Sequence, residues 1–467
     1  MGDGTEPEVL RRYRHLLRTA ALDWQETAHR RALTDLGPSA RADLLGELRV
    51  LLGTGYAMGV QRDGDVGKGF AGAAKVLEAV FEFPYLAHAA LEPLNAVARI
   101  ANGIVEVWGG HQMPDVHQMV SAQIAGVTPD KVKLHVMKTG GGFGRRAVAD
   151  ADIITEAVSV SKALGGRAVR VQWTREDDTR AGRYRPAYVH RLRAGLDQAG
   201  NIVAWQNHVV GQSIAEGTPF EAMMVKNGID PTSVEGAVHL PYAIPNTLVE
   251  LTTTKVGVPV LWWRAVGSTH TAYAVETFID ELAEAAGKDP VAFRLAMMKD
   301  HPREAAVLRL AAEKAGWSQP VAPGIFRGVA LAESFGTVVA QIVELAIEGG
   351  APKVRRVVCA LDCGIAVNPD NVRAQIEGGI GFGLGAILKS RLTLEKGRVV
   401  EGNFDGYEVL RIEEMPKVEV HIVPSTSKPS GVGEPGVPPI GPALANAFHA
   451  ATRRRIRMLP FNRPENA

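Results

Sequence analysis

The chain has 467 residues, of which 46% are apolar, and its formal net charge at pH 7 is +1. A chain of this size can bury a large core and is expected to form two or three domains. The near-neutral charge gives no reason to expect a nucleic acid or an anionic membrane as partner, and no apolar run in the sequence is long enough to span a bilayer.

Residues 1–53 are predicted to form an appended helical segment. Apolar side chains recur at helical spacing from Leu10 to Ala28 and from Leu44 to Leu52, with Pro38 between the two runs. Arginines and acidic residues balance here, which favours a solvated helical hairpin over a nucleic-acid arm. No secretory signal is visible, so the expected location is the cytoplasm.

The next stretch holds a predicted loop, a strand and several histidines. Glycine and aspartate are dense over residues 59–69, which indicates a loop, and alternation over 77–83 predicts a half-buried strand. His88 and Glu92 could be ligands four residues apart, but Pro93 argues against a helix and favours a structural histidine. His111 and His117 are more typical of a plain loop than of a metal site.

Four glycines fall within five positions at Gly140–Gly144, after a predicted strand at 132–136 and before a predicted helix at 151–164. Without side chains the backbone can approach a bulky ligand, and the turn and helix start would offer free N–H groups to an anion. The spacing matches neither the dinucleotide-binding fingerprint nor the P-loop.

The remaining elements alternate between helices and strands. A strand is predicted at 168–173, and the charged run 175–178 is predicted to be a solvated face. Helices are predicted at about 272–286, from Asp289-Pro290, and from His301-Pro302 to Gly316. After Gly324 the pattern favours strands, notably 354–361 and 418–423.

Cys359 and Cys363 are predicted to be structural. Two cysteines are too few for an iron–sulfur cluster with four thiolate ligands, so any cluster must lie on another chain.

Four motifs taken together are specific where each alone is weak: Gln112, Gly140–Gly144, Gln375 to Gly379, and Gly431 to Gly436. From about Met58 to about Pro460 the chain resembles the molybdopterin-binding subunit of the molybdenum hydroxylases, the xanthine dehydrogenase and aldehyde oxidase superfamily, and most closely the isoquinoline 1-oxidoreductase beta subunits. The resemblance implies an α+β fold of mixed sheets with packed helices. It implies a first molybdopterin-binding region over residues 59–320 and a second over 321–467.

The resemblance also implies roles for individual residues. Glu434 matches the family's catalytic base, Gln112 a glutamine near the oxo ligand, and Arg264 an arginine that orients the substrate. The positions that match cofactor contacts are Gly141, Gly142, Phe143, Gly144, Gln375 and Gly433. The protein is expected to supply no ligand to the metal, and the cofactor would be molybdopterin, with the cytosine dinucleotide form as one option. A glutamate crowded by glycine and proline can be desolvated beside a bulky partner, which suits a base.

The implied activity is hydroxylation of an N-heteroaromatic or aldehyde with oxygen from water, with electrons passing to a small [2Fe-2S] subunit. Arg145, Arg146 and Ala147 replace the second glutamate region of purine-oxidising members, which argues against a purine substrate. The GQG-type pterin loop of the isoquinoline-type subunits is missing. Its absence motivates a second hypothesis, a truncated or fused remnant that keeps the fold without the cofactor. A third hypothesis is a module that binds or inserts the cofactor and turns nothing over.

Overall fold

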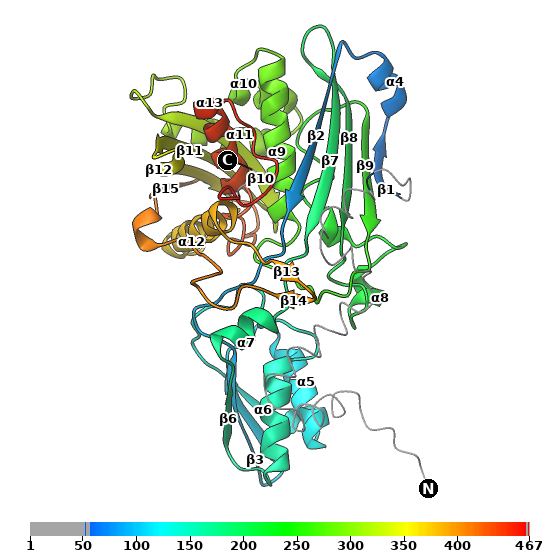
Figure 1. Ribbon diagram of the computed structural model, residues 1–467, viewed down its shortest axis with the longest axis vertical. Helices are drawn as coiled ribbons and strands as arrows, with labels where there is room; N and C mark the ends of the chain where they lie inside the picture. The colour runs from blue at the N-terminus through cyan, green and yellow to red at the C-terminus, as the bar shows by residue number, and fades with distance from the viewer. Residues whose placement is uncertain (1–51, 53–56, 464–465, 467) are drawn as a thin grey trace.

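Three mixed β-sheets organise the chain, as a computed structural model that describes residues 52, 57–463 and 466 shows. The first and second sheets lie side by side in the upper body of Figure 1, and the third forms the lower lobe with its own helices. Each sheet contains one parallel strand pair among antiparallel ones. The predicted α+β class with mixed sheets is therefore confirmed. The predicted helical segment 1–53 lies outside the described residues, apart from Leu52.

The first sheet has five strands in the order β1 (Met58–Asp63), β9 (Thr247–Thr253), β8 (Ile202–Gly211), β7 (Tyr188–Leu196) and β2 (Lys75–Phe83). The predicted strand at 77–83 is the greater part of β2, which pairs antiparallel with β7 along its whole length. Helix α4 (Val66–Ala71) follows β1, and Asp65 caps it by accepting from the Lys68 N–H. The prediction of a loop over 59–69 is therefore wrong. Although these residues show no apolar periodicity, β1 is ordered by its pairing with β9 and α4 by its N-cap.

The second sheet has the order β10 (Phe326–Ser334), β11 (Thr337–Glu348), β12 (Ala351–Asp362) and β15 (Lys417–Ile422). The predicted strands at 354–361 and 418–423 are the greater parts of β12 and β15. Helices α11 (Pro302–Lys314) and α13 (Ile440–Thr452) pack on β11, so the first seven residues of this strand are all buried. Cys359 and Cys363 are buried free thiols in this core, as a structural role requires.

The third sheet has the order β5 (Val132–Val136), β4 (Ile104–Gly109), β3 (Asn95–Ala101) and β6 (Val169–Gln172). Helices α5 (Pro114–Ala125) and α6 (Asp152–Ala163) cover it and share its own apolar core. Both predicted strands and the predicted helix at 151–164 are confirmed here. The prediction that the charged run 175–178 is a solvated face is wrong. These residues begin α7 (Arg175–Arg180), where Arg175 pairs with the buried Asp178 at 3.1 Å.

Helix α9 (Ser268–Ala285) lies between the first and second sheets and contacts β2, β7, β10 and α13. Nearly all of its side chains are buried, so one helix joins the two sheets into a common core. Helix α10 (Pro290–Met297) follows it, and Asp289 caps α10 by accepting from the Ala292 N–H, as predicted.

Helix α12 (Pro369–Leu388) runs beneath the second sheet, near the lower lobe, in Figure 1. The sequence did not predict it, because five glycines interrupt its apolar pattern. Those glycines face close neighbours: a Cβ on Gly379 would lie 3.2 Å from the Gly436 backbone, and one on Gly383 only 2.5 Å from Ile440. The remaining short elements are α8 (Glu221–Met224), β13 (Leu394–Glu395), β14 (Arg398–Val399) and the 3-10 turns η1 (Pro129–Lys131), η2 (Pro231–Ser233) and η3 (Ile412–Glu414).

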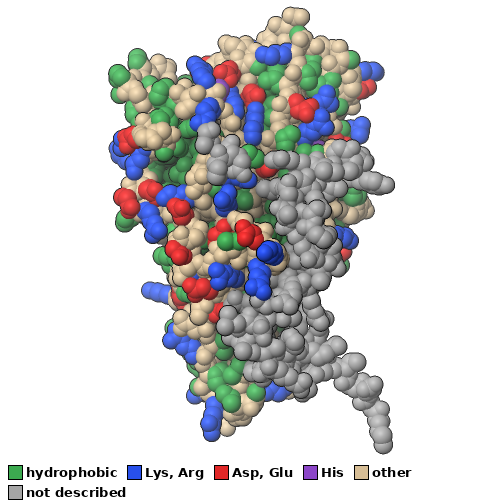
Figure 2. Space-filling model, in the orientation of Figure 1, with side chains coloured by type: hydrophobic (Ala, Val, Ile, Leu, Met, Phe, Trp, Pro, Cys, Tyr) green, Lys and Arg blue, Asp and Glu red, His purple; other side chains and the backbone are tan. Residues whose placement is uncertain are grey.

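On the face drawn in Figure 2, basic and acidic side chains are interspersed over the described surface rather than gathered by sign. In the part of the chain that the structure describes, no helix combines the length and the hydropathy needed to cross a bilayer.

Candidate functional site

The glycine-rich loop Gly140–Gly144 leaves the lower lobe and is held by two long side chains. Glu92 accepts a hydrogen bond from the Gly140 N–H. Arg146 donates from Nε to the Gly141 carbonyl oxygen over 2.9 Å, and its backbone N–H donates to Gln112 Oε1 over 3.1 Å. The free N–H at the start of this loop is therefore already occupied, and α6 begins well after it. The predicted anion site formed by a helix start does not exist in this form.

Glycine is required in the loop for steric reasons. A Cβ on Gly142 would lie 2.5 Å from Gln112 Oε1. Gly144 has φ of 108°, and a Cβ there would lie 2.5 Å from the Trp262 carbonyl oxygen. The loop is thus fitted closely to Gln112 on one side and to the segment Trp262–Gly267 on the other.

The segment Trp262–Gly267 leads into α9 and carries Arg264 at the centre of the site. The Arg264 N–H donates to the Phe143 carbonyl oxygen over 3.1 Å. Its side chain donates to the Gly433 carbonyl oxygen over 2.7 Å and to the carbonyl and amide oxygens of Gln375 over 3.1 and 3.2 Å. One arginine therefore ties together the glycine loop, α12 and the loop that carries Glu434.

Glu434 is half buried, and its Oε1 accepts from the Ala265 N–H over 3.0 Å. Burial raises the pKa of this carboxyl, while the Ala265 N–H and the nearby Arg264 charge oppose the rise. A carboxylate held in place by one oxygen, with a raised pKa, is suited to accept a proton.

Three stacked rings join the two halves of the site. Phe382 on α12 lies 4.4 Å from Phe143 and 4.4 Å from Trp263, between ring centroids. The Trp263 indole N–H donates to the Ala87 carbonyl oxygen over 3.0 Å. Of the tryptophan pair, Trp263 is therefore a core residue.

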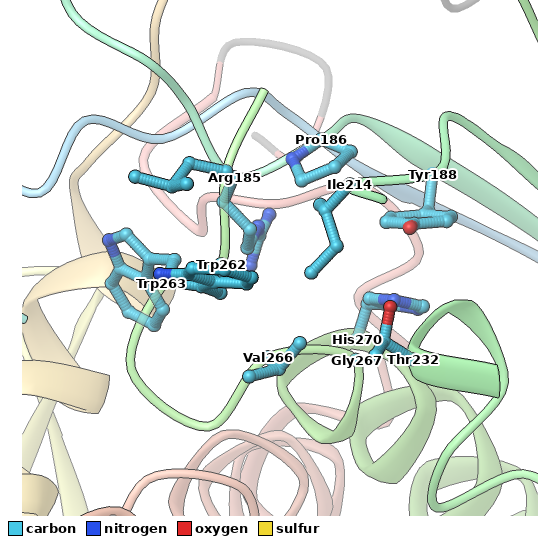
Figure 3. Close-up of a pocket in the computed structure, with 11 residues that line it drawn as sticks. Arg185, Pro186, Tyr188, Ile214, Thr232, Trp262, Trp263, Val266, Gly267 and His270 are labelled. Carbon is cyan, nitrogen blue, oxygen red and sulfur yellow. The ribbon is translucent and has the colours of Figure 1, made fainter. Parts of the chain in front are cut away.

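A small cavity lies behind the same segment, where Trp262, Val266, His270 and Arg185 converge in Figure 3. It has room for roughly one water molecule. The buried Arg185 Nε and His270 Nε2 have no hydrogen-bond partner among the described residues. The cavity is therefore too small for an aromatic substrate as it stands.

The nine predicted site residues form one connected set. Gln112 touches Gly142, Gly141 and Gly144 flank Phe143, and Arg264 reaches Phe143, Gln375 and Gly433. Glu434 follows Gly433 and binds the N–H next to Arg264. The contacts of Arg264 favour a positioning role over the direct substrate contact that the resemblance implies.

The side-chain amides of Gln112 and Gln375 offer donors at the rim of this set. Each Oε1 is fixed, by the Arg146 N–H and by Arg264 respectively, while each Nε2 has no acceptor among the described residues. Both side chains are exposed, and a Cβ on Gly433 would find only Gln375 within 4 Å. Amide donors beside side-chain-free backbone fit a large ligand rich in acceptor atoms, such as a pterin carrying an oxo-metal group.

Sequence reasoning missed three supporting residues, Arg146, Glu92 and Glu235. Arg146 was noted only as a departure from the purine-oxidising pattern, and Glu92 only as a possible ligand partner of His88. Glu235 accepts from the Gly267 N–H over 2.7 Å. Glu92 and Glu235 act on backbone groups 48 and 32 residues away, so no local signal identifies their roles. Arg146 acts on Gly141, five residues away, but nothing in the residue types between them predicts this contact.

The histidines have structural surroundings. Buried His88 pairs through Nε2 with the Trp262 carbonyl oxygen at 2.8 Å, which confirms its predicted structural role. His111 and His117 face each other at 2.7 Å between their Nδ1 atoms, and burial lowers the pKa of both to about 4. His117 lies on α5 rather than in a loop. Within residues 57–463 no group of three metal-ligating side chains is found.

Comparison with known proteins gives a consistent result. Residues 53–298 and 292–416 match two family models, each described as a molybdopterin cofactor-binding domain. The chain is 34% identical to isoquinoline 1-oxidoreductase subunit beta of Brevundimonas diminuta over 80% of this chain and 48% of the relative. It is 31% identical to a membrane-bound aldehyde dehydrogenase (pyrroloquinoline-quinone) of Gluconacetobacter polyoxogenes over 85% of this chain and 55% of the relative.

Among solved structures, quinoline 2-oxidoreductase of Pseudomonas putida 86 superposes with a TM-score of 0.74 and 16% identity, over 88% of this chain and 78% of that one. This likeness shows a shared fold. The chain spans about half the length of the two curated relatives above.

Proposed function

Because the chain belongs to the molybdopterin cofactor-binding domain family of the molybdenum hydroxylases, we propose that it binds a molybdopterin cofactor and forms the catalytic part of a hydroxylase for an N-heteroaromatic or an aldehyde. The observation that carries this proposal is the single network of contacts through Arg264. It brings the glycine loop, Gln375 and Glu434 together from positions spread over 290 residues of sequence, from Gly144 to Glu434.

The cofactor would lie against the glycine loop and Gly433, with the Nε2 amides of Gln112 and Gln375 donating to its acceptor atoms. When bound, it would supply the oxygen that is transferred to the substrate and the site that accepts the substrate's electrons. Backbone without side chains lets a bulky group approach, and fixed amide donors stabilise negative charge that develops on it.

Glu434 would act as the general base. The Ala265 N–H holds Oε1, so Oε2 is the oxygen left to accept a proton during attack on an electron-poor carbon. Its raised pKa strengthens it as a base, and the charge of the adjacent Arg264 opposes part of the rise.

The names of the relatives support two substrate classes, heteroaromatics and aldehydes. The designation of the isoquinoline 1-oxidoreductase relative as a subunit supports a partner that carries the electrons onward. We assign that partner to a small [2Fe-2S] chain, since the two buried cysteines cannot hold a cluster. Release of cytidine monophosphate on acid hydrolysis of the purified protein would identify the dinucleotide form of the cofactor.

The test is molybdenum per chain, measured by elemental analysis after expression with the neighbouring genes, together with turnover. Near-stoichiometric metal is expected, and Glu434→Gln should retain the metal while losing turnover by about 100-fold or more, as expected when a general base is removed. Asp289→Asn, at the N-cap of α10, serves as a control that keeps both.

The absence of metal in every preparation would instead favour the second hypothesis, a remnant without cofactor. Metal without turnover on any heteroaromatic or aldehyde would favour a module that only binds the cofactor.

A further inference from the structure

Two carboxyl groups bind the same short turn at the start of α9. The Ala265 N–H donates to Glu434, and two residues later the Gly267 N–H donates to Glu235 over 2.7 Å. Between them Ala265 and Val266 have φ of 73° and 44°. Two successive non-glycine residues in the left-handed region are strained, and such a turn persists only where its surroundings hold it.

Glu235 is positioned to hold this turn. It lies just after η2, and its own carbonyl oxygen accepts from Thr271 Oγ1 on the first turn of α9. A Cβ on Gly267 would lie 1.9 Å from the Thr232 carbonyl oxygen, so the turn is pressed directly against the η2 backbone. The carboxyl and the backbone of Glu235 thus fix both the turn and the helix start.

We propose that Glu235 is a positioning residue for Glu434, which it reaches through the turn Ala265–Gly267 that both carboxyl groups bind. This inference rests on the proposed function only for the role of Glu434 as a base. The contacts themselves belong to the chain alone.

The electrostatics add a second link between the two groups. Burial raises the pKa of Glu235 to about 7, the Gly267 and Ser268 N–H groups oppose the rise, and the charges of Glu434 and Asp230 add to it. Asp230 is fixed by the Thr232 N–H over 2.9 Å. Glu434 instead faces the Arg264 cation, which opposes the rise that burial causes in its own pKa.

Glu235 therefore loses its proton as the pH rises through about 7. When Glu235 releases its proton to solvent, the new charge beside Glu434 raises the proton affinity of Glu434 and makes it a stronger base. A neutral Glu235 keeps its acceptor oxygen on Gly267, so the turn is held in both states.

The experiment is a titration of Glu235 in the full chain without cofactor. Infrared pH-difference spectra of the protein with 13C-labelled glutamate would report the carboxyl bands, and the Glu235 band is the one that Glu235→Gln removes. In Glu434→Gln, which keeps an acceptor for the Ala265 N–H, the pKa of Glu235 should fall by roughly one unit because a neighbouring like charge is gone. Glu434→Ala gives the same test if the glutamine variant does not fold.

The control is Asp289→Asn, which neutralises a capping carboxylate beyond the far end of α9. It should leave the Glu235 titration unchanged. An unchanged Glu235 titration in both Glu434 variants, or an equal fall in the control, would overturn the proposal.

If the proposed function also holds, Glu235→Gln in the metal-loaded enzyme should lose an inflection near pH 7 from its kcat/KM profile while retaining its molybdenum. Since the infrared shift needs no cofactor, its failure and the failure of the proposed function are observed separately.

Discussion

Arg264 donates from Nε to the carbonyl oxygen of Gly433 over 2.7 Å, although 169 residues separate the two in the chain. The same guanidinium reaches Gln375 on α12, and the guanidinium is largely desolvated, which lowers its pKa. A planar group with fixed donors can hold two backbone carbonyls at once, and an ammonium group cannot reproduce that geometry.

We therefore expect Arg264→Lys to loosen the contact between α12 and the loop of Glu434. The unfolding free energy should fall by about 2 kcal/mol, since charged hydrogen bonds to part-buried carbonyl oxygens are lost, and bound molybdenum should fall with it. Chemical denaturation and elemental analysis measure both. Arg191→Lys, at an exposed ion pair with Glu78, should change neither the stability nor the bound molybdenum. Equal effects in the two variants would refute the role of Arg264 in holding α12 against the loop of Glu434.

Gly144→Ala should damage the glycine loop. The residue has φ of 108°, and its new Cβ would lie 2.5 Å from a backbone oxygen that cannot move away cheaply. The expected loss is about 2 kcal/mol or more of stability, with loss of cofactor. Gly59→Ala is the matched control, because nothing lies within 4 Å of its Cβ position. A Gly144→Ala protein as stable and as metal-rich as Gly59→Ala would contradict this account.

Phe382→Ala should separate the two halves of the site, because the ring stacks on both Phe143 and Trp263. A loss of about 3 kcal/mol is expected from the cavity and the missing stacking. Phe382→Leu fills most of the volume and should recover about half of that loss. Thermal denaturation of the two variants decides the point: if leucine behaves like alanine, the ring is not held by packing.

Glu156 on α6 provides a prediction about pH. Burial raises the pKa of its carboxyl to about 7, and the Trp173 indole N–H, 2.8 Å away, only partly offsets the rise. A pKa raised in the folded state means that stability is fully present below the ordinary value of 4.5 and is lost as pH rises through about 7.

Glu156→Gln should remove this loss. The unfolding free energy of the variant minus that of the wild type should increase from pH 5 to pH 8, by an amount on the order of 2 kcal/mol. Denaturation midpoints at the two pH values measure it. A constant difference between the proteins at both pH values would show that Glu156 does not titrate in this range.

The sequence by itself determined the strands and helices whose patterns are local. Alternation identified β2, β5, β6 and β15, an apolar run identified β12, and proline after a capping residue marked the start of α10. These signals suffice because the buried face of each element is written into its own periodicity. Motifs of unusual residue types also predicted that the glycine loop and Glu434 belong to one site; their roles there stay predictions.

Only the tertiary structure decided the rest. Helix α12 has a weak helical signal because its glycines serve close approach to Gly436 and Ile440, a requirement imposed by another part of the chain. The charged run of α7 is buried because Arg175 also meets the carbonyl oxygens of Ala90 and Leu91. The carboxyl of Glu235 is held by the Gly267 N–H, 32 residues further along the chain. The hydrogen-bond partners of these residues lie far away in the sequence. Contacts of this kind produce no periodic pattern in a single sequence, so they could not be predicted from it.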